Sequence, residues 1–382
     1  MANLKKNLSI LSITLGSGGA EKVISLLLKK LIIDYNVTLI LFYNEMHFSI
    51  PKEVKVVLLC QKSANRRLHM KFFDAFVFIY KYHDVIRERK IAYAISFLAF
   101  PNLVNGIISL FNKNIKTIIS ERGFPSENTS SKLSLYISKL FYPFFYNRCD
   151  KLFSNSVYIN RDLKANFGIK IPMGVIYNPI ETPEKTKVPS SLNTNLDTMK
   201  LVTAGTLNTR KNQIMILKAI QESNINYHLD ILGEGHLKDY LSKEIKVRKL
   251  ENNVYLKGKV KNVNDYLLKS HCFILSSFTE GFPNALLEAM AIGLPTISTN
   301  CLSGPLELLN NNELVTLKKG AFIKAKYGLL INNDDQEALK NALDYYNNNP
   351  NERERYSTLS LERAKHYLLK NIYSQFNQFI IN

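Results

Sequence analysis

Short apolar runs alternate with amphipathic segments along the first half of the chain. The runs are four to eight residues long and cover 8–15, 37–43, 54–59, 92–98 and 117–120. Segments with a helical spacing of apolar positions, such as 20–33, lie between several of them. Strands that are apolar on both faces and alternate with helices are typical of a parallel sheet covered on both sides. The pattern therefore predicts a βα domain over residues 1–180.

A polar segment at 181–198 interrupts this alternation. It contains two prolines and no aromatic residue, which is typical of an interdomain linker. The alternation then resumes, with strands expected at 200–204, 227–232, 254–256, 272–276, 295–298 and 328–331. We interpret residues 199–357 as a second βα domain and residues 358–382 as a C-terminal helix. Because ligands of open α/β sheets bind beyond the carboxyl ends of the strands, two such domains predict a cleft between facing sheets.

The uncharged segment 91–112 is long enough to cross a bilayer as a helix. Pro101 would leave a hydrogen bond unmade inside such a helix. We therefore expect a buried strand over 92–98, a turn, and a helix that starts near Pro101. Close to the N-terminus, the apolar run ends at Leu15 without a small-residue cleavage site, so no export signal is expected.

Composition narrows the class of protein. Hydrophobic residues make up 46% of the 382 residues and charged residues 21%, which indicates a globular chain and excludes disordered and collagen-like classes. The four cysteines are scattered without a CxxC or a Cys/His spacing. This spacing argues against structural zinc and a disulfide framework, and it fits a reducing cytoplasm.

The net charge of +18 is concentrated in the first half of the chain. Residues 1–190 hold 27 Lys/Arg against 13 Asp/Glu, or +14, and the remainder holds 23 against 19, or +4. Such a basic half attracts nucleic acid, anionic lipid or phosphorylated substrates. Basic and aromatic residues interleave at 70–90 and 132–148. These segments fit either ordinary amphipathic core helices or helices that contact anionic lipid.

The first candidate for ligand binding is the glycine loop GSGGAE at 16–21, between the first strand and the first helix. Glycines let a backbone approach a ligand closely, and the helix that follows offers free N–H groups. The loop lacks the full dinucleotide fingerprint. A tight turn without a ligand explains these glycines equally well.

The second candidate is the loop GTLNTRKN at 205–212, after the first strand of the second domain. Arg210 and Lys211 lie at the expected start of a helix, where the helix dipole disfavours cations. Because folding does not favour cations there, we expect them to serve an anion such as a diphosphate. The alternative is a solvated surface pair.

The third candidate is the segment 276–291, SSFTEGFPNALLEAMA. Pro283 is suited to the first position of a helix, which places Glu280 in the preceding loop and Glu288 in the second turn. The N–H groups of Asn284 and Ala285 can then hold phosphate oxygens. Glu288 has an apolar residue on each side in the sequence, so burying its carboxylate would be costly without hydrogen-bond donors. Sugar hydroxyls are such donors.

Together these segments resemble the retaining glycosyltransferases of family 4, which have the GT-B fold. The resemblance rests on GSGGAE, GTLNTRKN, the EGFPNALLE segment with its E-x7-E spacing, and the IGLPTIST that follows it. The resemblance extends over residues 142–181, which contain an aromatic-rich helix followed by CDKLFSNS and GVIYNPIE. The resemblance implies an α/β fold of two Rossmann-like domains that face each other across a cleft. It also implies that the first domain binds the acceptor, that the second binds a nucleotide-sugar, and that the C-terminal helix packs back on the first domain.

The resemblance further implies a set of roles. Arg210 and Lys211 neutralise the diphosphate of the donor. Glu280 binds hydroxyls of the transferred sugar, and Glu288 binds the ribose. The backbone near Val260 contacts the base. The full donor-binding set is Gly18, Gly19, Arg210, Lys211, Val260, Gly281, Phe282, Asn284, Ala285 and Glu288.

The chain departs from that family in one place. Many members have a histidine of the first domain near the transferred sugar, and the equivalent stretch here reads SERGFP at 120–125. Arg122 or Glu121 is then expected to take the place of the histidine. The expected catalytic residues are therefore Glu280, Arg122 and Glu121.

The resemblance implies a glycosyltransferase that moves a hexose or N-acetylhexosamine from a UDP-sugar to a growing, lipid-linked cell-surface glycan. The expected location is the cytoplasm, with peripheral contact to the anionic inner face of the membrane. No metal or other cofactor is expected in the site. The alternatives are an epimerase-like GT-B enzyme that acts on UDP-sugars, and a basic nucleic-acid-binding protein, for which no motif is present.

Overall fold

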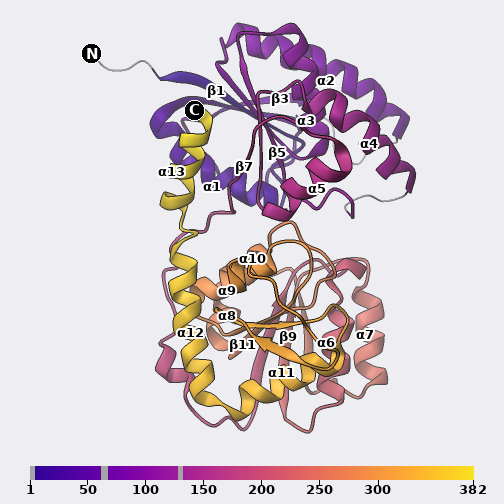
Figure 1. Cartoon of the computed structure of the whole chain (residues 1–382), viewed down its shortest axis with the longest axis vertical. Coiled ribbons are helices and arrows are strands. Elements are labelled where there is room, and N and C mark those ends of the chain that lie inside the picture. The colour runs from indigo at the N-terminus through magenta and orange to yellow at the C-terminus, as the bar shows by residue number, and fades with distance from the viewer. Residues whose placement is uncertain (1–4, 62–67, 128–131) are drawn as a thin grey trace. The chain divides into compact units, whose positions relative to one another are not determined.

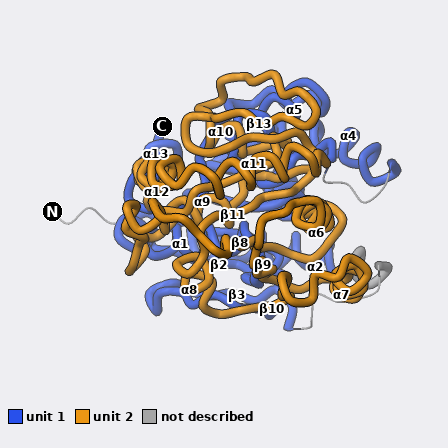
Figure 2. The backbone as a smooth tube through the Cα atoms, turned by 90° about the horizontal axis from the view of Figure 1, so that it is seen from below, with its two compact units in different colours: residues 1–179, 369–382 blue, residues 180–368 orange. Residues whose placement is uncertain are grey.

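The computed structural model describes residues 5–61, 68–127 and 132–382. The chain divides into two compact units, which Figure 2 shows in different colours. Unit 1 consists of residues 1–179 together with 369–382, and unit 2 consists of residues 180–368. Each unit is an α/β layer structure built around one mainly parallel sheet, as the alternating apolar pattern predicts.

Unit 1 contains a parallel seven-stranded sheet with strand order β3-β2-β1-β4-β5-β6-β7. The strands are β1 (Lys6–Ser12), β2 (Tyr35–Tyr43), β3 (Lys55–Cys60), β4 (Tyr93–Phe97), β5 (Lys116–Glu121), β6 (Lys151–Ser154) and β7 (Met173–Val175). The helices between them are α1 (Gly19–Asp34), α2 (Leu68–Glu88), α3 (Ala99–Phe111), α4 (Lys132–Tyr146) and α5 (Val157–Phe167). The order reverses beside β1, so the loops after β1 and β4 flank a switch point of the kind where ligands bind.

The core of unit 1 forms because the central strands are apolar on both faces. Ile10 and Leu11 of β1, which point to opposite faces of the sheet, are both fully buried. On one face, Phe78 of α2 stacks on Phe42 of β2 with ring centroids 4.6 Å apart, and Val104 of α3 joins the same cluster. The strands therefore need helices on both sides.

The uncharged segment 91–112 forms β4 and α3, as its proline and asparagines predict. Its helix begins at Ala99, so Pro101 lies in the first turn, where a missing N–H costs little. Asn102 and Asn105 are buried and bonded: Asn102 Nδ2 donates to the Ser120 carbonyl at 2.9 Å and Asn105 Nδ2 to the Ala94 carbonyl at 2.9 Å. Across the described residues, no helix combines the length and apolarity needed to cross a membrane.

Unit 2 contains a second seven-stranded sheet with order β10-β9-β8-β11-β12-β14-β13, in which only β13 runs antiparallel. Its strands are β8 (Met199–Ala204), β9 (Tyr227–Leu232), β10 (Val254–Gly258), β11 (Cys272–Leu275), β12 (Thr296–Thr299), β13 (Phe322–Lys324) and β14 (Leu329–Ile331). Its helices are α6 (Gln213–Gln221), α7 (Lys238–Val247), α8 (Val263–Lys269), α9 (Asn284–Ile292), α10 (Pro305–Asn310), α11 (Gln336–Asn348) and α12 (Pro350–Lys365). Two 3₁₀ turns, η1 (Pro189–Leu192) and η2 (Thr209–Lys211), complete it.

The C-terminal segment differs from the expectation of one helix over 358–382. Helix α12 begins at Pro350 and belongs to unit 2, where Ser357 and Ser360 donate to the carbonyls of Gly293 and Leu294. Helix α13 (Leu369–Ile381) belongs to unit 1. These side-chain bonds tie the middle of α12 to the residues just after α9.

Helix α13 packs on unit 1 and lies beside α1 (Figure 1). Phe376 is fully buried against Phe153 of β6, with ring centroids 5.3 Å apart. Tyr35 donates to Asn377 Oδ1 at 2.6 Å. A side chain at Gly174 would meet the ring of Phe379 at 2.7 Å, so β7 needs glycine there. The last residues of the chain thus complete the first unit.

Candidate functional site

Three charged residues meet at the carboxyl ends of β8 and β11 in unit 2. Lys211 Nζ lies 2.5 Å from Glu280 Oε1, and Arg210 Nη1 lies 3.0 Å from Glu280 Oε2. Strands β8 and β11 are parallel neighbours, so the loops that follow them leave the sheet side by side. The structure thus joins the second and third sequence candidates into one site.

Hydrogen bonds between the two loops hold this charge cluster in place. The Phe278 amide donates to the Arg210 carbonyl at 2.8 Å, and Ser276 Oγ donates to the Lys211 carbonyl at 2.8 Å. Ser277 Oγ donates to Glu280 Oε1 at 2.6 Å. The backbone that carries both cations is therefore fixed before any ligand arrives, which is the preorganisation that binding of a charged group requires.

The carboxylate of Glu280 is only 6% exposed, yet it stays ionised. Burial would raise its pKa, but Lys211, Arg210 and the Ser277 hydroxyl outweigh burial and hold the pKa below its ordinary value. Two cations around one carboxylate leave a net positive charge at this edge of the sheet. That charge is available to an anion.

The structure revises the expectation that folding has no use for Arg210 and Lys211. Lys211 is only 14% exposed and neutralises a buried carboxylate, so it has a structural task as well. Arg210 is 42% exposed and its contact with Glu280 resembles a surface ion pair. Both residues precede α6 in the turn η2, rather than lying inside the helix.

The loop that carries Glu280 is held by the segment after β12. The Glu280 amide donates to the Leu302 carbonyl at 2.8 Å, and Ser303 Oγ donates to the Gly281 carbonyl at 2.6 Å. A side chain at Gly304 would meet Pro283 at 2.6 Å. Sequence reasoning missed Ser277, Ser303 and Gly304. The Gly304-Pro305 pair at the start of α10 was a usable signal for this close contact.

Helix α9 carries the remaining expected donor-binding residues of this loop. Pro283 comes just before the helix, Asn284 and Ala285 are its first residues, and Glu288 lies one turn further on. Phe282 is buried and its ring packs on Tyr367 with centroids 5.7 Å apart, so its backbone is the part that can face a ligand. Asn284, Ala285 and Glu288 are half-buried, which leaves them accessible to a small molecule.

Two further glycines bring the loops after β8 and β9 together. A side chain at Gly233 would meet the Gly205 carbonyl oxygen at 2.0 Å, and one at Gly235 would meet the Leu207 carbonyl oxygen at 2.2 Å. The Gly233 amide also donates to the Gly258 carbonyl, just before the loop that holds Val260. Sequence reasoning missed Gly233 and Gly235, although a G-x-G directly after a strand was visible.

The glycine loop of unit 1 joins β1 to α1, as expected, but carboxylates surround it. A side chain at Gly18 would meet Glu21 Oε2 at 2.3 Å, and one at Gly16 would meet Glu45 Oε1 at 3.1 Å. Burial, together with Glu45, raises the pKa of Glu21. These carboxylates would repel a diphosphate, so the roles expected of Gly18 and Gly19 stay predictions without support from the local charges.

Glu121 and Arg122 lie at the carboxyl end of β5, and both are buried. Glu121 Oε2 accepts from Tyr146 at 3.0 Å, and Oε1 accepts from the Arg122 amide at 3.2 Å. Burial raises the pKa of Glu121 to about 7 and lowers the pKa of Arg122 to about 9. Glu121 therefore points into the core, toward α4, whereas Arg122 donates through Nη2 to Asn178.

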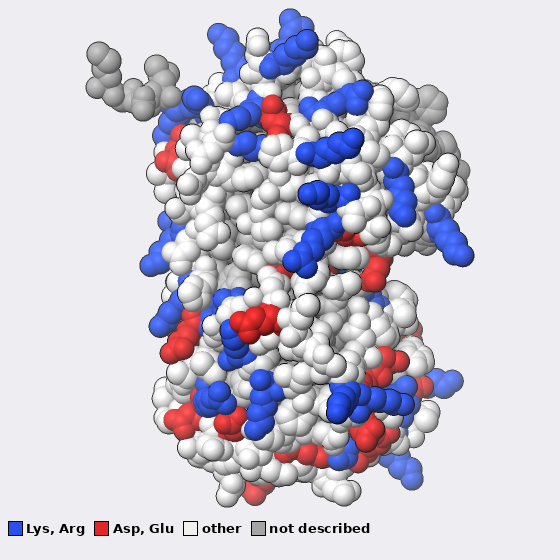
Figure 3. All heavy atoms as spheres, in the orientation of Figure 1, with Lys and Arg blue, Asp and Glu red and all other residues white. Residues whose placement is uncertain are grey.

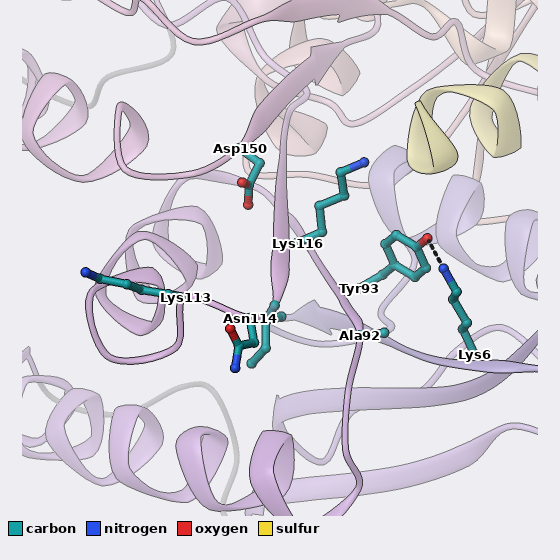
Figure 4. Close-up of a pocket in the computed structure, with 8 residues that line it drawn as sticks. Lys6, Ala92, Tyr93, Lys113, Asn114, Lys116 and Asp150 are labelled. Atoms are coloured by element: carbon teal, nitrogen blue, oxygen red, sulfur yellow. Dashed lines mark hydrogen bonds between the residues drawn. The ribbon is translucent and has the colours of Figure 1, made fainter.

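A separate cavity of about 320 Å³ lies at the opposite, amino-terminal edge of the unit 1 sheet (Figure 4). Lys6, Tyr93, Lys116 and Asp150 are among its lining residues. Lys6 Nζ donates to the Tyr93 hydroxyl at 3.2 Å, and Lys116 Nζ donates to the Ile381 carbonyl at 3.1 Å. These lysines serve the fold by contacting β4 and the end of α13.

Within 5–61, 68–127 and 132–382, no three His, Cys, Asp or Glu side chains are grouped so that they could hold a metal ion. The positive charge described above comes instead from Arg210 and Lys211.

Comparisons with known proteins place this arrangement among sugar transferases. The sequence profile described as "Glycosyl transferases group 1" matches residues 184–361, which carry the charge cluster. An uncharacterised glycosyltransferase of Methanocaldococcus jannaschii is 30% identical over 348 residues, covering 86% of this chain and 83% of that protein.

A second relative is the N-acetylgalactosamine-N,N'-diacetylbacillosaminyl-diphospho-undecaprenol 4-alpha-N-acetylgalactosaminyltransferase of Campylobacter jejuni. It is 29% identical over 366 residues, covering 94% of this chain and 95% of the relative. Among solved structures, the lipopolysaccharide outer core galactosyltransferase WaaB in its apo form aligns over 98% of this chain and 99% of its own, with a TM-score of 0.75 at 18% identity. That likeness confirms the GT-B fold, whereas the assignment to family 4 stays a prediction.

We predict that Lys211→Ala lowers the free energy of unfolding by about 1.5–3 kcal/mol, the size of a charge-assisted hydrogen bond to a buried group. Arg210→Ala should lower the free energy of unfolding by no more than about 1 kcal/mol, because the Arg210 side chain is 42% exposed and water weakens its contact with Glu280. Urea unfolding at pH 7 measures both.

The pH dependence provides the control. Because the pKa of Glu280 in the folded protein lies below the ordinary value of 4.5, the ion pair contributes fully above that pH and is lost as the pH falls further. The difference between wild type and Lys211→Ala should therefore shrink below pH 4.5. Equal costs for the two variants at pH 7 would contradict the distinction between them.

Proposed function

The chain belongs to the group 1 glycosyl transferases, and we propose that it transfers a hexose or N-acetylhexosamine from a UDP-sugar to a growing lipid-linked glycan, with retention of the anomeric configuration. The observation that carries the proposal is the cluster of Arg210 and Lys211 on the buried carboxylate of Glu280. A preorganised positive charge next to a carboxylate suits a substrate that joins a diphosphate to a polyhydroxylated sugar.

In this proposal, Arg210 and Lys211 stabilise the charge that develops on the departing diphosphate. Glu280 uses its remaining lone pairs to accept hydrogen bonds from hydroxyls of the sugar. Glu288, one turn into α9, accepts from the ribose hydroxyls, and the first amides of α9 face the phosphates. The protein lowers the barrier mainly by placing fixed charges and donors around the reacting bond.

The transfer breaks the bond between the anomeric carbon and the phosphate oxygen and forms one between that carbon and an acceptor oxygen, on the same face of the sugar. The proton of the acceptor hydroxyl goes to the leaving phosphate oxygen. The two cations of unit 2 supply the neutralising charge, so the proposal includes no metal ion.

Two observations support a lipid-linked acceptor: the name of one relative and the basic charge of the first half of the chain. The Campylobacter jejuni relative is named for transfer to a diphospho-undecaprenol-linked glycan. The excess of Lys and Arg in residues 1–190 fits an acceptor that carries phosphates. An epimerase-like enzyme would act on UDP-sugar without an acceptor, and a nucleic-acid-binding protein has no use for a buried Glu280 held by two cations.

The direct test incubates the purified enzyme with several UDP-sugars, with and without a lipid-diphosphate-linked glycan, and measures UDP release. Release that depends on the acceptor supports the proposal. Interconversion of the UDP-sugar without an acceptor would favour the epimerase, and a product with inverted anomeric configuration would contradict retention.

We predict that Glu280→Gln and Glu288→Gln fail in different ways. The first should lower kcat roughly 100- to 1000-fold, because it removes a fixed charge beside the reacting sugar. The second should mainly raise the KM for the donor, because it removes a ribose contact made equally in the ground and transition states. Steady-state kinetics against donor concentration separates the two outcomes, and identical defects would argue against separate roles.

We further propose that unit 1 docks reversibly on the inner face of the cytoplasmic membrane. Its visible surface carries many Lys and Arg with few acidic residues (Figure 3). Helix α4 also presents an apolar stripe to solvent, because Leu133, Tyr136, Leu140 and Phe144 are 52–69% exposed and share one helix face. Basic charge beside exposed aromatic residues is typical of helices that lie in a lipid interface.

We predict that the protein binds anionic liposomes more strongly than neutral ones, and that salt weakens this binding. Reversing Arg87, in the last turn of α2, and Arg89, just after that helix, should weaken it further, since each cation near an anionic surface contributes about 1 kcal/mol. Arg66 and Arg67, which we also expect to contribute, lie outside the described residues. Leu140→Glu should weaken binding, whereas Leu314→Glu, at an exposed apolar position of unit 2, should not. Equal binding to both liposome types would contradict this docking.

A further inference from the structure

Arg122 stands out as a buried arginine at the ligand-binding edge of the unit 1 sheet. It directly follows β5 and is 8% exposed. Its guanidinium lies 5.7 Å from the ring centroid of Phe97, at the end of β4, and contacts Asn178, which follows β7. Asn155, which follows β6, donates to the same Asn178 oxygen at 3.3 Å. The ends of four neighbouring strands thus surround one cation.

This cation is incompletely satisfied. Nη2 donates to Asn178, but Nε and Nη1 are buried and have no hydrogen-bond partner among the described residues. The Oδ1 atom of Asn155 is likewise buried without a partner. Leaving a buried donor unpaired is costly, and more so when it carries charge. The unpaired donors therefore oppose the stability that the contacts of Arg122 with Asn178 and Phe97 provide.

The same chain shows what a structural buried arginine looks like. Arg353 of α12 is fully buried, and all three of its side-chain nitrogens donate to backbone carbonyls. Nε donates to Leu192 at 3.2 Å, Nη1 to Asn347 at 2.9 Å, and Nη2 to Thr194. The contrast between the two arginines indicates that Arg122 is kept for something other than packing.

The neighbouring carboxylate of Glu121 forms no ion pair with Arg122, although its charge counteracts part of the lowering of the Arg122 pKa by burial. The Glu121 carboxylate accepts from the Tyr146 hydroxyl and from the Arg122 backbone amide, and burial raises its pKa to about 7. Among the described residues, no carboxylate oxygen lies within salt-bridge distance of the Arg122 guanidinium. The Arg122 guanidinium, at the ends of β4 to β7, therefore has no ion-pair partner, and its positive charge is only partly compensated.

We propose that Arg122 binds a phosphoryl oxygen of a substrate through Nε and Nη1, which makes it the anion-binding residue of unit 1. The proposal rests on the proposed function, which offers two sources of this chemistry: the diphosphate of the UDP-sugar and the diphosphate of the lipid-linked acceptor. A guanidinium suits either one, because it stays charged and directs its donors rigidly.

Binding measurements that need no turnover distinguish the two sources. The affinities of wild type, Arg122→Gln and Arg122→Lys are measured for UDP and for detergent-solubilised undecaprenyl diphosphate. Uridine and undecaprenol, which lack phosphate, are the matched neutral ligands. We expect Arg122→Gln to weaken one of the two diphosphates at least 10-fold and to leave its neutral counterpart unchanged, with partial recovery in Arg122→Lys. The ligand that responds identifies the source.

Thermal unfolding separates this role from a structural one. Without ligand, Arg122→Gln should unfold at the same temperature as wild type or higher, because it removes an unpaired buried charge. Arg353→Gln, the matched control, should unfold at a clearly lower temperature because it leaves backbone carbonyls unpaired. Arg353→Lys is the milder alternative if that variant does not fold.

Unchanged affinities for both diphosphates, or a fall in unfolding temperature like that of Arg353→Gln, would overturn the proposal. Absence of sugar transfer by the wild type would instead contradict the proposed function. In that case, a selective loss of diphosphate affinity in Arg122→Gln would still support the anion site.

Discussion

The ionised carboxylate of Glu280, buried between Lys211 and Arg210, is the interaction on which the site in unit 2 depends. A buried carboxylate needs cations and donors, and the loops after β8 and β11 supply them. The same bonds that satisfy Glu280 hold the two cations at the carboxyl edge of the sheet. Structure and proposed catalysis therefore share one set of contacts, which explains why Lys211 has a folding task that its position in the sequence does not reveal.

Much of this fold could be predicted from the chain's apolar pattern. Runs such as 37–43 and 272–276 are buried on both faces, and only parallel strands under helices satisfy such runs. The division of the C-terminal segment between the two units could not be predicted, because it depends on contacts between distant parts of the chain, such as the bonds of Ser357 and Ser360 to carbonyls some 60 residues earlier. Strand β13 and helix α10 were also missed, since both are too short to show a periodic pattern.

In the candidate site too, local features could be predicted from the sequence, whereas contacts between distant residues could not. Glycine, proline and glutamate spacing identified the loop of Glu280 and the start of α9, because turn chemistry is local. The ion pairs between Glu280 and residues 210 and 211 join positions about 70 residues apart, and only tertiary structure reveals them. The sequence suggested equal roles for Glu121 and Arg122. Their surroundings differ in the structure. The Glu121 carboxylate accepts a hydrogen bond from Tyr146, whereas Arg122 keeps two buried donors without a partner among the described residues.

The central claim is that Arg210 and Lys211 form the donor diphosphate site while held by Glu280. The affinity of Arg210→Ala for UDP, compared with its affinity for uridine, tests this claim most directly, because Arg210 is half-exposed and its loss should leave the fold intact. The account predicts that UDP binds at least about 10-fold more weakly than to wild type, the size of one charge-assisted hydrogen bond, and that uridine binds equally well to both. An unchanged UDP affinity, or an equal loss for UDP and uridine, would contradict it.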